Sequence, residues 1–292
     1  MSHTTGPIVV GFDGSPRSGL ALDWAVDEAQ RWQVPLHVVY ARMMPLRGPT
    51  PEVGLVVQET EADEVLGAAV DRVHELAPRL GTTTSSRYGA PAPLLVDASR
   101  GASGLVVGAR GRGGVASALL GSTSVDVAAH AHCPVTVVRQ LPEVVADRPG
   151  VVVGVDGSEL SESAVAVAFA QAAARSVPLT VVHAWFLEYT AASLQLLDLQ
   201  HERQRIAQEE QALAAELVAG WSEKYPDVVV RRHVVNAHPV QALADHSRGA
   251  ELVVVGSRGR GGFAGLVLGS VSQGVLHHAH APVMVVRPEG GA

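Results

Sequence analysis

One glycine-spaced loop occurs twice in this chain, and each copy ends in a serine hydroxyl. The pattern Gly-x2-Gly-x9-Gly-Ser spans residues 108–122 and returns at 256–270. Glycines let a backbone approach an anion and expose its N–H groups, and the start of a following helix adds unpaired donors and a positive dipole end. The pattern therefore predicts two phosphate-binding loops. Its fixed positions are Gly108, Gly111, Gly121 and Ser122 in the first copy and Gly256, Gly259, Gly269 and Ser270 in the second.

Arginines accompany both loops. Arg110 and Arg112 lie in the first loop, and Arg258 and Arg260 lie in the second. A guanidinium fork suits phosphate oxygens, so these side chains are candidate phosphate ligands. They could instead be solvated loop charges or contacts across a dimer interface, and the sequence leaves these alternatives open.

The loops belong to a longer internal duplication. Residues 8–15 match 151–158 at an offset of 143, whereas the loops match at an offset of 148, so the second copy carries five extra residues between them. Between 100–124 and 248–272, 16 of 25 positions are identical. Such identity, with drift elsewhere, indicates a site that is constrained in both halves. A recent duplication that has not yet diverged is the alternative.

Length and composition fit two tandem domains. The chain has 292 residues, of which 47% are hydrophobic and 17% charged, and each half is long enough to bury its own core. We predict domains at 1–143 and 150–292, joined where proline, glycine and charged residues interrupt the apolar pattern. No apolar run approaches the roughly 20 residues of a membrane-spanning helix, and residues 1–7 lack a signal-peptide core. We therefore expect a cytoplasmic protein with no membrane partner.

Charge and residue usage exclude several classes of protein. The net charge of −7 argues against general nucleic-acid binding. The basic residues are 21 arginines and one lysine, Lys224, so the chain has no Walker A loop, and a Schiff-base lysine would have to lie in a charged helical stretch. The single cysteine, Cys133, rules out an intrachain disulfide, and we expect it to be buried. No cysteine or carboxylate near His277, His278 and His280 completes a metal site, so we expect none.

Short apolar runs alternate with helical segments in both halves. The runs are continuous rather than alternating, which predicts central parallel strands covered by helices on both faces. Ser15 and Pro16 are typical of a helix N-cap and first helical position. The predicted strands are 8–12, 36–40, 83–88, 105–108 and 135–139 in the first half, and 151–155, 179–184, 228–235, 252–256 and 283–287 in the second. The predicted helices of the first half are 17–33, about 57–80, 92–99 and 122–130.

The order of these motifs closely resembles the universal stress protein family in its tandem form. The resemblance rests on hydrophobic-Gly-x-Asp-Gly-Ser at the first strand, the glycine pattern, and Cys-Pro-Val or Ala-Pro-Val after it, and it covers about 7–139 and 150–287. It implies an α/β fold of two tandem Rossmann-like domains. Each would be an open five-stranded parallel sheet in order 3-2-1-4-5 with helices on both faces. It also implies that members with the full glycine signature bind ATP.

The resemblance gives each candidate residue a role. Asp13 and Asp156 would bond the ribose or nearby polar atoms, and the backbone of Ala41 and Ala184 would read the adenine edge. The glycine loops would surround the phosphates. The implied binding residues are Asp13, Ala41, Gly108, Arg110, Gly111, Gly121 and Ser122 in the first half, and Asp156, Ala184, Gly256, Arg258, Gly259, Gly269 and Ser270 in the second.

Simpler interpretations stay open for some of these residues. The Asp-Gly-Ser sequence favours a turn, so each aspartate could be a turn-forming residue. Ser122 and Ser270 could be plain helix N-caps. The halves also differ beside the adenine position, where Tyr40 stands in the first and His183 in the second, so the two sites could have unequal affinity.

We expect an ATP-binding stress-response regulatory protein, in which nucleotide occupancy of two sites, with Mg²⁺, tunes conformation or partner binding. The alternative is a slow ATPase or another nucleotide-using enzyme, but neither a Walker lysine nor a positioned base is evident. A dinucleotide-dependent oxidoreductase is disfavoured, because the Gly-Arg-Gly fragment at 259–261 follows the fourth strand of its half rather than the first. The protein partner is not specified, and a homodimer of tandem chains is left open.

Overall fold

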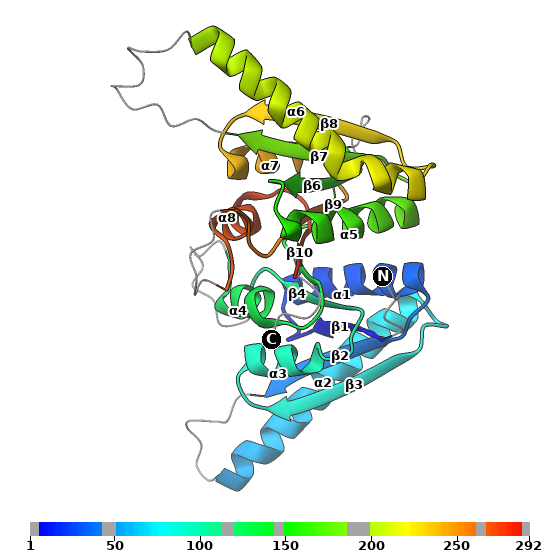
Figure 1. The fold of residues 1–292 in the computed structure, drawn as a ribbon. Coiled ribbons are helices and arrows are strands. Elements are labelled where there is room, and N and C mark those ends of the chain that lie inside the picture. Colours follow the sequence, from blue (N-terminus) through cyan, green and yellow to red (C-terminus); the bar gives the residue numbers. More distant parts are fainter. Residues whose placement is uncertain are drawn as a thin grey trace. The chain divides into compact units, whose positions relative to one another are not determined.

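The structure, a computed structural model, forms two compact units, Met1–Leu141 and Pro142–Ala292. Within the described residues each unit contains five parallel strands and four helices (Figure 1). The described residues are 6–42, 51–111, 120–142, 149–185, 199–260 and 267–287, and the side chains of 51–58, Glu159 and 199–204 are not among them.

Strands and helices alternate along unit 1 as predicted. The strand order is β3-β2-β1-β4-β5 and all neighbouring strands are parallel, which confirms the expected order 3-2-1-4-5. The strands are β1 (Ile8–Gly11), β2 (Leu36–Arg42), β3 (Thr82–Tyr88), β4 (Gly104–Gly108) and β5 (Val135–Val138). The helices are α1 (Pro16–Trp32), α2 (Pro51–Leu76), α3 (Pro91–Ala98) and α4 (Ser122–His130).

Unit 2 repeats this arrangement. Its strands lie in the order β8-β7-β6-β9-β10 and are again parallel, so the second half also has the predicted order. The strands are β6 (Val151–Val155), β7 (Leu179–Trp185), β8 (Val230–Asn236), β9 (Leu252–Gly256) and β10 (Val283–Val286). The helices are α5 (Glu159–Arg175), α6 (Leu199–Lys224), α7 (Pro239–His246) and α8 (Ser270–His278).

Each sheet is buried between two pairs of helices. In unit 1, α1 packs with α2 and α3 packs with α4, one pair on each face of the strands (Figure 1). The central strands are apolar on both faces, and Val9, Val10 and Val106 are almost fully buried, as expected for parallel strands that helices cover on both sides. The first helix starts as predicted, with Ser15 as the N-cap and Pro16 in the first turn.

The largest boundary differences from the sequence prediction are in helix α2 and strand β2. Helix α2 begins at Pro51 rather than about 57, because proline suits a first helical turn, and it ends at Leu76 rather than about 80, because Pro78 follows. Strand β2 runs on to Arg42. The five extra residues of the second half fall between strand and long helix, where 43–50 in unit 1 corresponds to 186–198 in unit 2.

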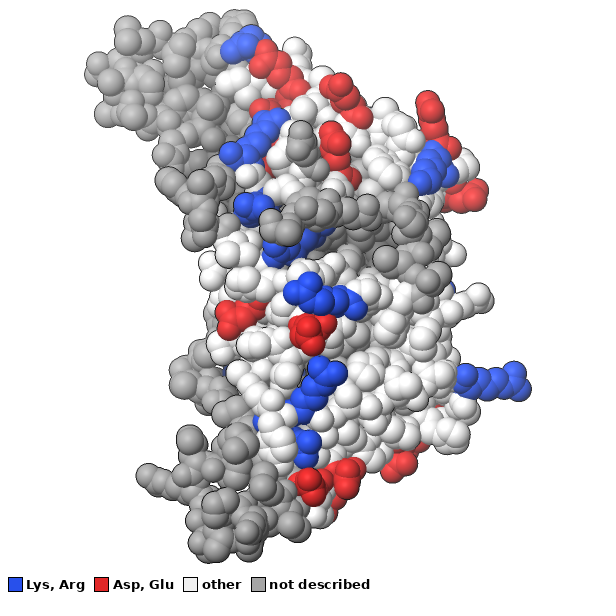
Figure 2. Space-filling view, turned by 60° about the horizontal axis from the view of Figure 1, so that its bottom comes forward, with Lys and Arg blue, Asp and Glu red and all other residues white. Residues whose placement is uncertain are grey.

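Charged side chains of both signs are interspersed on the face shown in Figure 2. Pairs such as Arg72 with Asp23, 2.9 Å apart, and Arg205 with Glu209, 2.6 Å apart, join exposed neighbours, and such pairs contribute little to stability. None of the helices in the described part of the chain has the length and apolar character that crossing a bilayer requires.

Candidate functional site

A cavity of about 580 Å³ lies at the carboxyl ends of β1, β2 and β4 in unit 1. Open α/β sheets place ligand sites at this edge, and the volume falls within the roughly 300–1,000 Å³ of small-molecule sites. All seven residues predicted for the first site line it, namely Asp13, Ala41, Gly108, Arg110, Gly111, Gly121 and Ser122. The structure therefore brings together the β1–α1 turn, the end of β2 and the β4–α4 loop.

The first two glycines of the loop are required by different neighbours. A Cβ on Gly108 would lie 2.8 Å from the carbonyl oxygen of Arg17, so this glycine lets the first turn of α1 pack against the end of β4. A Cβ on Gly111 would lie 2.5 Å from Oδ2 of Asp13, so that glycine makes room for the carboxylate. The sequence pattern suggested that Gly108 and Gly111 contact phosphate. Within the fold itself, both glycines are required for packing against neighbouring atoms.

The helix that follows each loop starts one residue earlier than the serine N-cap interpretation requires. The N-cap of α4 is Gly121 and that of α8 is Gly269, and no side chain caps either helix. Ser122 and Ser270 are therefore the first helical residues, so the N-cap interpretation of these serines is wrong. The hydroxyl of Ser122 lines the cavity instead, beside the free N–H groups that begin a helix.

Both aspartates form the turn that Asp-Gly-Ser favours. Oδ1 of Asp13 accepts a hydrogen bond from the backbone N–H of Ser15 at 3.0 Å. The carboxylate of Asp156 accepts from Ser158 N–H, from the hydroxyls of Ser158 and Ser161, and from the N–H of Arg260 at 2.8 Å. Burial raises the pKa of Asp156, but these hydrogen bonds outweigh burial and place its pKa below the ordinary aspartate value.

The backbone of Ala41 faces the cavity for a topological reason. Leu36 N–H donates toward β3, to Gly81 O, whereas Val39 accepts from Phe12 N–H on the β1 side. Successive residues of a strand point their N–H and C=O groups to alternate sides, so Ala41 faces the β1 side, where β1 has already ended. Ala184 holds the corresponding position beyond the end of β6.

Arginines lie near one another at the end of the last strand of each unit, close to Arg110 or Arg258 of the glycine loop. Burial lowers the pKa of Arg139, at the end of β5, and the guanidinium groups of Arg17 and Arg110 lower it further. Burial and Arg258 lower the pKa of Arg287 in unit 2. Nη1 of Arg287 is buried without a hydrogen-bond partner in the described part of the chain. Crowded cations of this kind favour an anionic ligand.

Sequence reasoning missed Arg139 and Arg287, although both copies carry an arginine directly after the last strand. The repetition of this arginine in both copies was the signal that could have revealed it. Of the arginines that the sequence analysis did consider, Arg112 lies outside the described residues. Arg260 donates its N–H to Asp156, and its side chain lies against Gly157.

The two units differ at the position before the base-reading alanine. Tyr40 lines the cavity of unit 1. His183 replaces it in unit 2 and is almost fully buried, with Nδ1 2.8 Å from Val155 O and Nε2 2.5 Å from an Oε atom of Glu210 on α6. The residue of α2 that corresponds to Glu210 is Ala62, which is buried. A tyrosine–alanine combination in one unit is thus a histidine–glutamate pair in the other.

The remaining candidate groups are the histidines and the single cysteine. Among the described residues no group of three or more His, Cys, Asp and Glu side chains is placed to hold a metal ion. Cys133 is buried as expected, and burial raises the pKa of its thiol to about 12. A thiol with this pKa is not a nucleophile at neutral pH.

An open parallel sheet with a glycine-lined, arginine-rich cleft at its carboxyl edge belongs to the ligand-binding α/β proteins. The universal stress protein family matches residues 4–139 and 150–287, and the chain belongs to this family in its tandem form. It is 40% identical to the universal stress protein Rv2005c of Mycobacterium tuberculosis, over 96% of each chain.

Two solved structures extend the comparison. The universal stress protein from Archaeoglobus fulgidus DSM 4304 shares the fold, with a TM-score of 0.71 at 20% identity over 97% of this chain and 96% of that one. A structure of the universal stress protein from Archaeoglobus fulgidus in complex with dAMP is 30% identical, with a TM-score of 0.34, and covers 44% of this chain and 94% of that one.

Proposed function

We propose that this universal stress protein is an ATP-binding regulatory protein whose two clefts each hold one nucleotide. The main support is the cavity of unit 1, where seven separately predicted residues meet, with Arg110 and the glycine loop on one side and the open edge of β2 on the other. Phosphate groups would bind at the first of these, and the edge of a nucleotide base would bind at the second. Occupancy would tune conformation or the affinity for a protein partner.

The phosphates would lie against the glycine loop and the start of α4. Ser124 Oγ donates to Gly108 O at 2.8 Å and Gly121 N–H donates to Ala109 O at 2.8 Å, so the two ends of the loop are held together. These two ends are therefore positioned before a ligand arrives, which lowers the entropic cost of ordering them on binding. Arg110 would neutralise phosphate charge, and a bound polyphosphate would relieve the mutual repulsion that lowers the pKa of Arg139.

The base and the ribose would lie toward β2. The N–H and C=O of Ala41 and Ala184 offer one donor and one acceptor to an adenine edge. Asp13 and Asp156, which directly follow the first strand of each unit, would accept from a ribose hydroxyl. Mg²⁺ would enter with the nucleotide, because this ion binds through substrate phosphates and few protein groups.

Calorimetry on the full chain tests this proposal. Titration with ATP and MgCl₂ should give about two sites per chain, and Gly111→Ala or Gly259→Ala should each remove or weaken one. The added Cβ would displace the carboxylate of Asp13 or Asp156 and crowd the backbone at the loop. AMP, dAMP and ADP complete the ligand panel, and chromatography of the mixture detects slow hydrolysis.

Two results would contradict the proposal. One is the absence of heat of binding with a folded protein, as judged by circular dichroism. The other is full affinity at both sites in both variants, which would place the nucleotide elsewhere. Steady production of ADP would shift the conclusion toward the slow ATPase.

A further inference from the structure

Two histidine rings from different elements lie in contact in unit 2. His233 is in the middle of the edge strand β8 and is exposed, and His246 is the last residue of α7 and is half-buried. Their ring centres are 4.9 Å apart, and the ring planes are inclined at 64°. Helix α7 begins after β8, at the carboxyl edge of the sheet, and runs back along it. The pair therefore lies away from the proposed nucleotide cleft.

Both rings have a nitrogen atom available for a ligand. Nδ1 of His246 is 2.8 Å from Ala242 O, a carbonyl that can only accept, so Nδ1 donates and the neutral ring keeps its lone pair on Nε2. His233 makes no hydrogen bond within the described ranges, and burial, His246 and Arg231 lower its pKa. The neutral imidazole is the form that binds a metal ion, and a backbone partner on the other nitrogen is usual for such a ligand.

The separation of the two rings suits one metal ion. Zinc binds an imidazole nitrogen at about 2.0–2.1 Å, and the ring centre lies about 1.1 Å behind that nitrogen, so two rings on one tetrahedral ion have centres roughly 5 Å apart. The 4.9 Å between His233 and His246 agrees with this value. The rings of His277 and His278 are farther apart, with centres separated by 6.4 Å. Both ring nitrogens of His37 already have hydroxyl partners, at 2.8 and 2.9 Å.

The surroundings of the pair include one favourable and one unfavourable charge. His246 lies in the last turn of α7, where the negative end of the helix dipole favours a cation. Arg231 lies near His233 and would oppose a divalent cation. Both carboxylate oxygens of Asp245 are 3.0 Å from the amide nitrogen of Gln241, which holds this side chain. The pair therefore offers two protein ligands, and water would complete the coordination.

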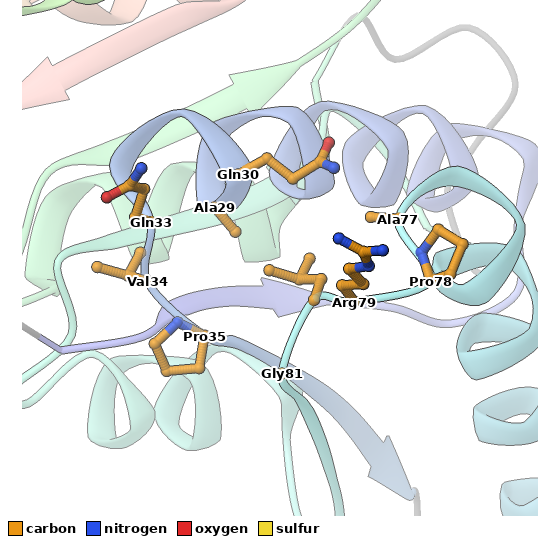
Figure 3. Close-up of a pocket in the computed structure, with 10 residues that line it drawn as sticks. Ala29, Gln30, Gln33, Val34, Pro35, Ala77, Pro78, Arg79 and Gly81 are labelled. Atoms are coloured by element: carbon orange, nitrogen blue, oxygen red, sulfur yellow. The ribbon is translucent and has the colours of Figure 1, made fainter.

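Unit 1 has neither histidine. Ser85 and Ala98 occupy the corresponding positions of β3 and α3, at an offset of 148 residues. Unit 1 has a second cavity, of about 640 Å³, at the amino ends of β2 and β3 (Figure 3). Residues 29–30, 33–35 and 77–81 line this cavity, and none of them is His, Cys, Asp or Glu. Unit 1 is therefore an internal reference that lacks the histidine pair.

We propose that His233 and His246 form a Zn²⁺ site that is specific to unit 2. The ion joins the edge strand β8 to the end of α7. Structural and catalytic zinc sites use three or four protein ligands, so a site with two is weaker and exchangeable, with a dissociation constant on the order of 10–100 μM. The proposal does not depend on nucleotide binding, because the pair is distant from the carboxyl edge of the sheet.

Long-range ¹H–¹⁵N NMR of the histidine rings tests the proposal, with ZnCl₂ added to the full chain near neutral pH and without nucleotide. The signals of both rings should shift together and saturate. His233→Ser and His246→Ala, which introduce the residues of unit 1, should each weaken binding at least about tenfold, because one imidazole ligand remains. Arg231→Thr should strengthen binding about threefold, because it removes a like charge. His238→Ala, which removes an exposed histidine outside the pair, is the matched control and should leave the affinity unchanged.

Three results would overturn the proposal. They are the absence of a saturating shift of these two rings up to about 1 mM ZnCl₂, a shift of only one of them, and undiminished affinity in either histidine variant. Persistent binding in both variants would place the ion on other histidines. Circular dichroism should show that His233→Ser is folded, because His233 is exposed, so this variant decides the question even if His246→Ala is unstable.

Discussion

The two units share their strand order and their glycine loops but differ where the long helix meets the sheet. Unit 2 joins β7 to α6 through His183 and Glu210, and unit 1 has Tyr40 and Ala62 in the same places. The glycines and arginines of the two loops are identical, whereas the helix contacts have changed in matched sets. Packing within each unit accounts for some of the retained loop positions, such as Gly108 and Gly111, and the proposed ligand would account for the retained arginines.

The buried ring of His183 lies between two acceptors. Its Nδ1 is 2.8 Å from the carbonyl oxygen of Val155, which can only accept, and its Nε2 is 2.5 Å from a carboxyl oxygen of Glu210. Removing Glu210 would leave Nε2 of this buried ring without its partner.

The largest expected effect is that of breaking this pair. Glu210→Ala should lower the free energy of unfolding of unit 2 by about 3 kcal/mol, because His183 then loses its partner in a buried site. The double variant His183→Tyr/Glu210→Ala, which copies unit 1, should recover most of the loss. Native-state hydrogen exchange of the β7 amides measures the effect separately from unit 1. An equal loss of unfolding free energy in the single and double variants would show that positions 183 and 210 are not energetically coupled.

Truncating the aromatic cluster of Phe169, Trp221 and Tyr225 should have the next largest effect. Tyr225→Ala removes a half-buried ring that stacks on two others and should cost about 2 kcal/mol in unit 2. Tyr225→Phe keeps the ring and should cost less than about 1 kcal/mol. Urea unfolding of the full chain provides the comparison. A Tyr225→Ala loss no larger than that of Tyr225→Phe would contradict the role assigned to the ring.

Asp156 should give unit 2 a smaller, pH-dependent contribution. Its pKa is lower in the folded state than in the unfolded chain, so its contribution is complete above the unfolded value of about 4 and is lost as pH falls through the lower folded value. Asp156→Asn should therefore reduce stability at pH 7 by about 1 kcal/mol and flatten the pH dependence of unit 2 below about pH 4. If the stability of unit 2 depends on pH in the variant as it does in the unmodified chain, Asp156 does not cause that dependence.

The smallest effect concerns Cys133. Its counterpart in unit 2 is Ala281, which is buried in the same way, so Cys133→Ala should cost no more than about 1 kcal/mol. With its raised pKa, the native thiol should react with a disulfide reagent at pH 8 only after unfolding. Rapid labelling of the folded chain would show that the thiol is accessible.

The features that local pattern determines were predictable from the sequence. The apolar strands, the Ser15 cap and the glycine loops are visible in short stretches of chain, and the family resemblance supplied the strand order. The reasons for individual glycines were not, because Gly108 is required by the carbonyl of Arg17, which only the fold brings near. Arg139 and the His183–Glu210 pair likewise depend on contacts between distant elements. The serine N-cap interpretation failed by one residue, a distinction finer than sequence patterns resolve.

Nucleotide content tests the central claim most directly. Freshly purified full-length protein would be denatured, and the released small molecules identified and counted by mass spectrometry, with calorimetry for any site that is empty on purification. Two adenine nucleotides per chain, released or titrated, are the predicted result. A folded chain that releases no nucleotide and binds none in the presence of Mg²⁺ would contradict the proposal that its duplicated loops are nucleotide sites.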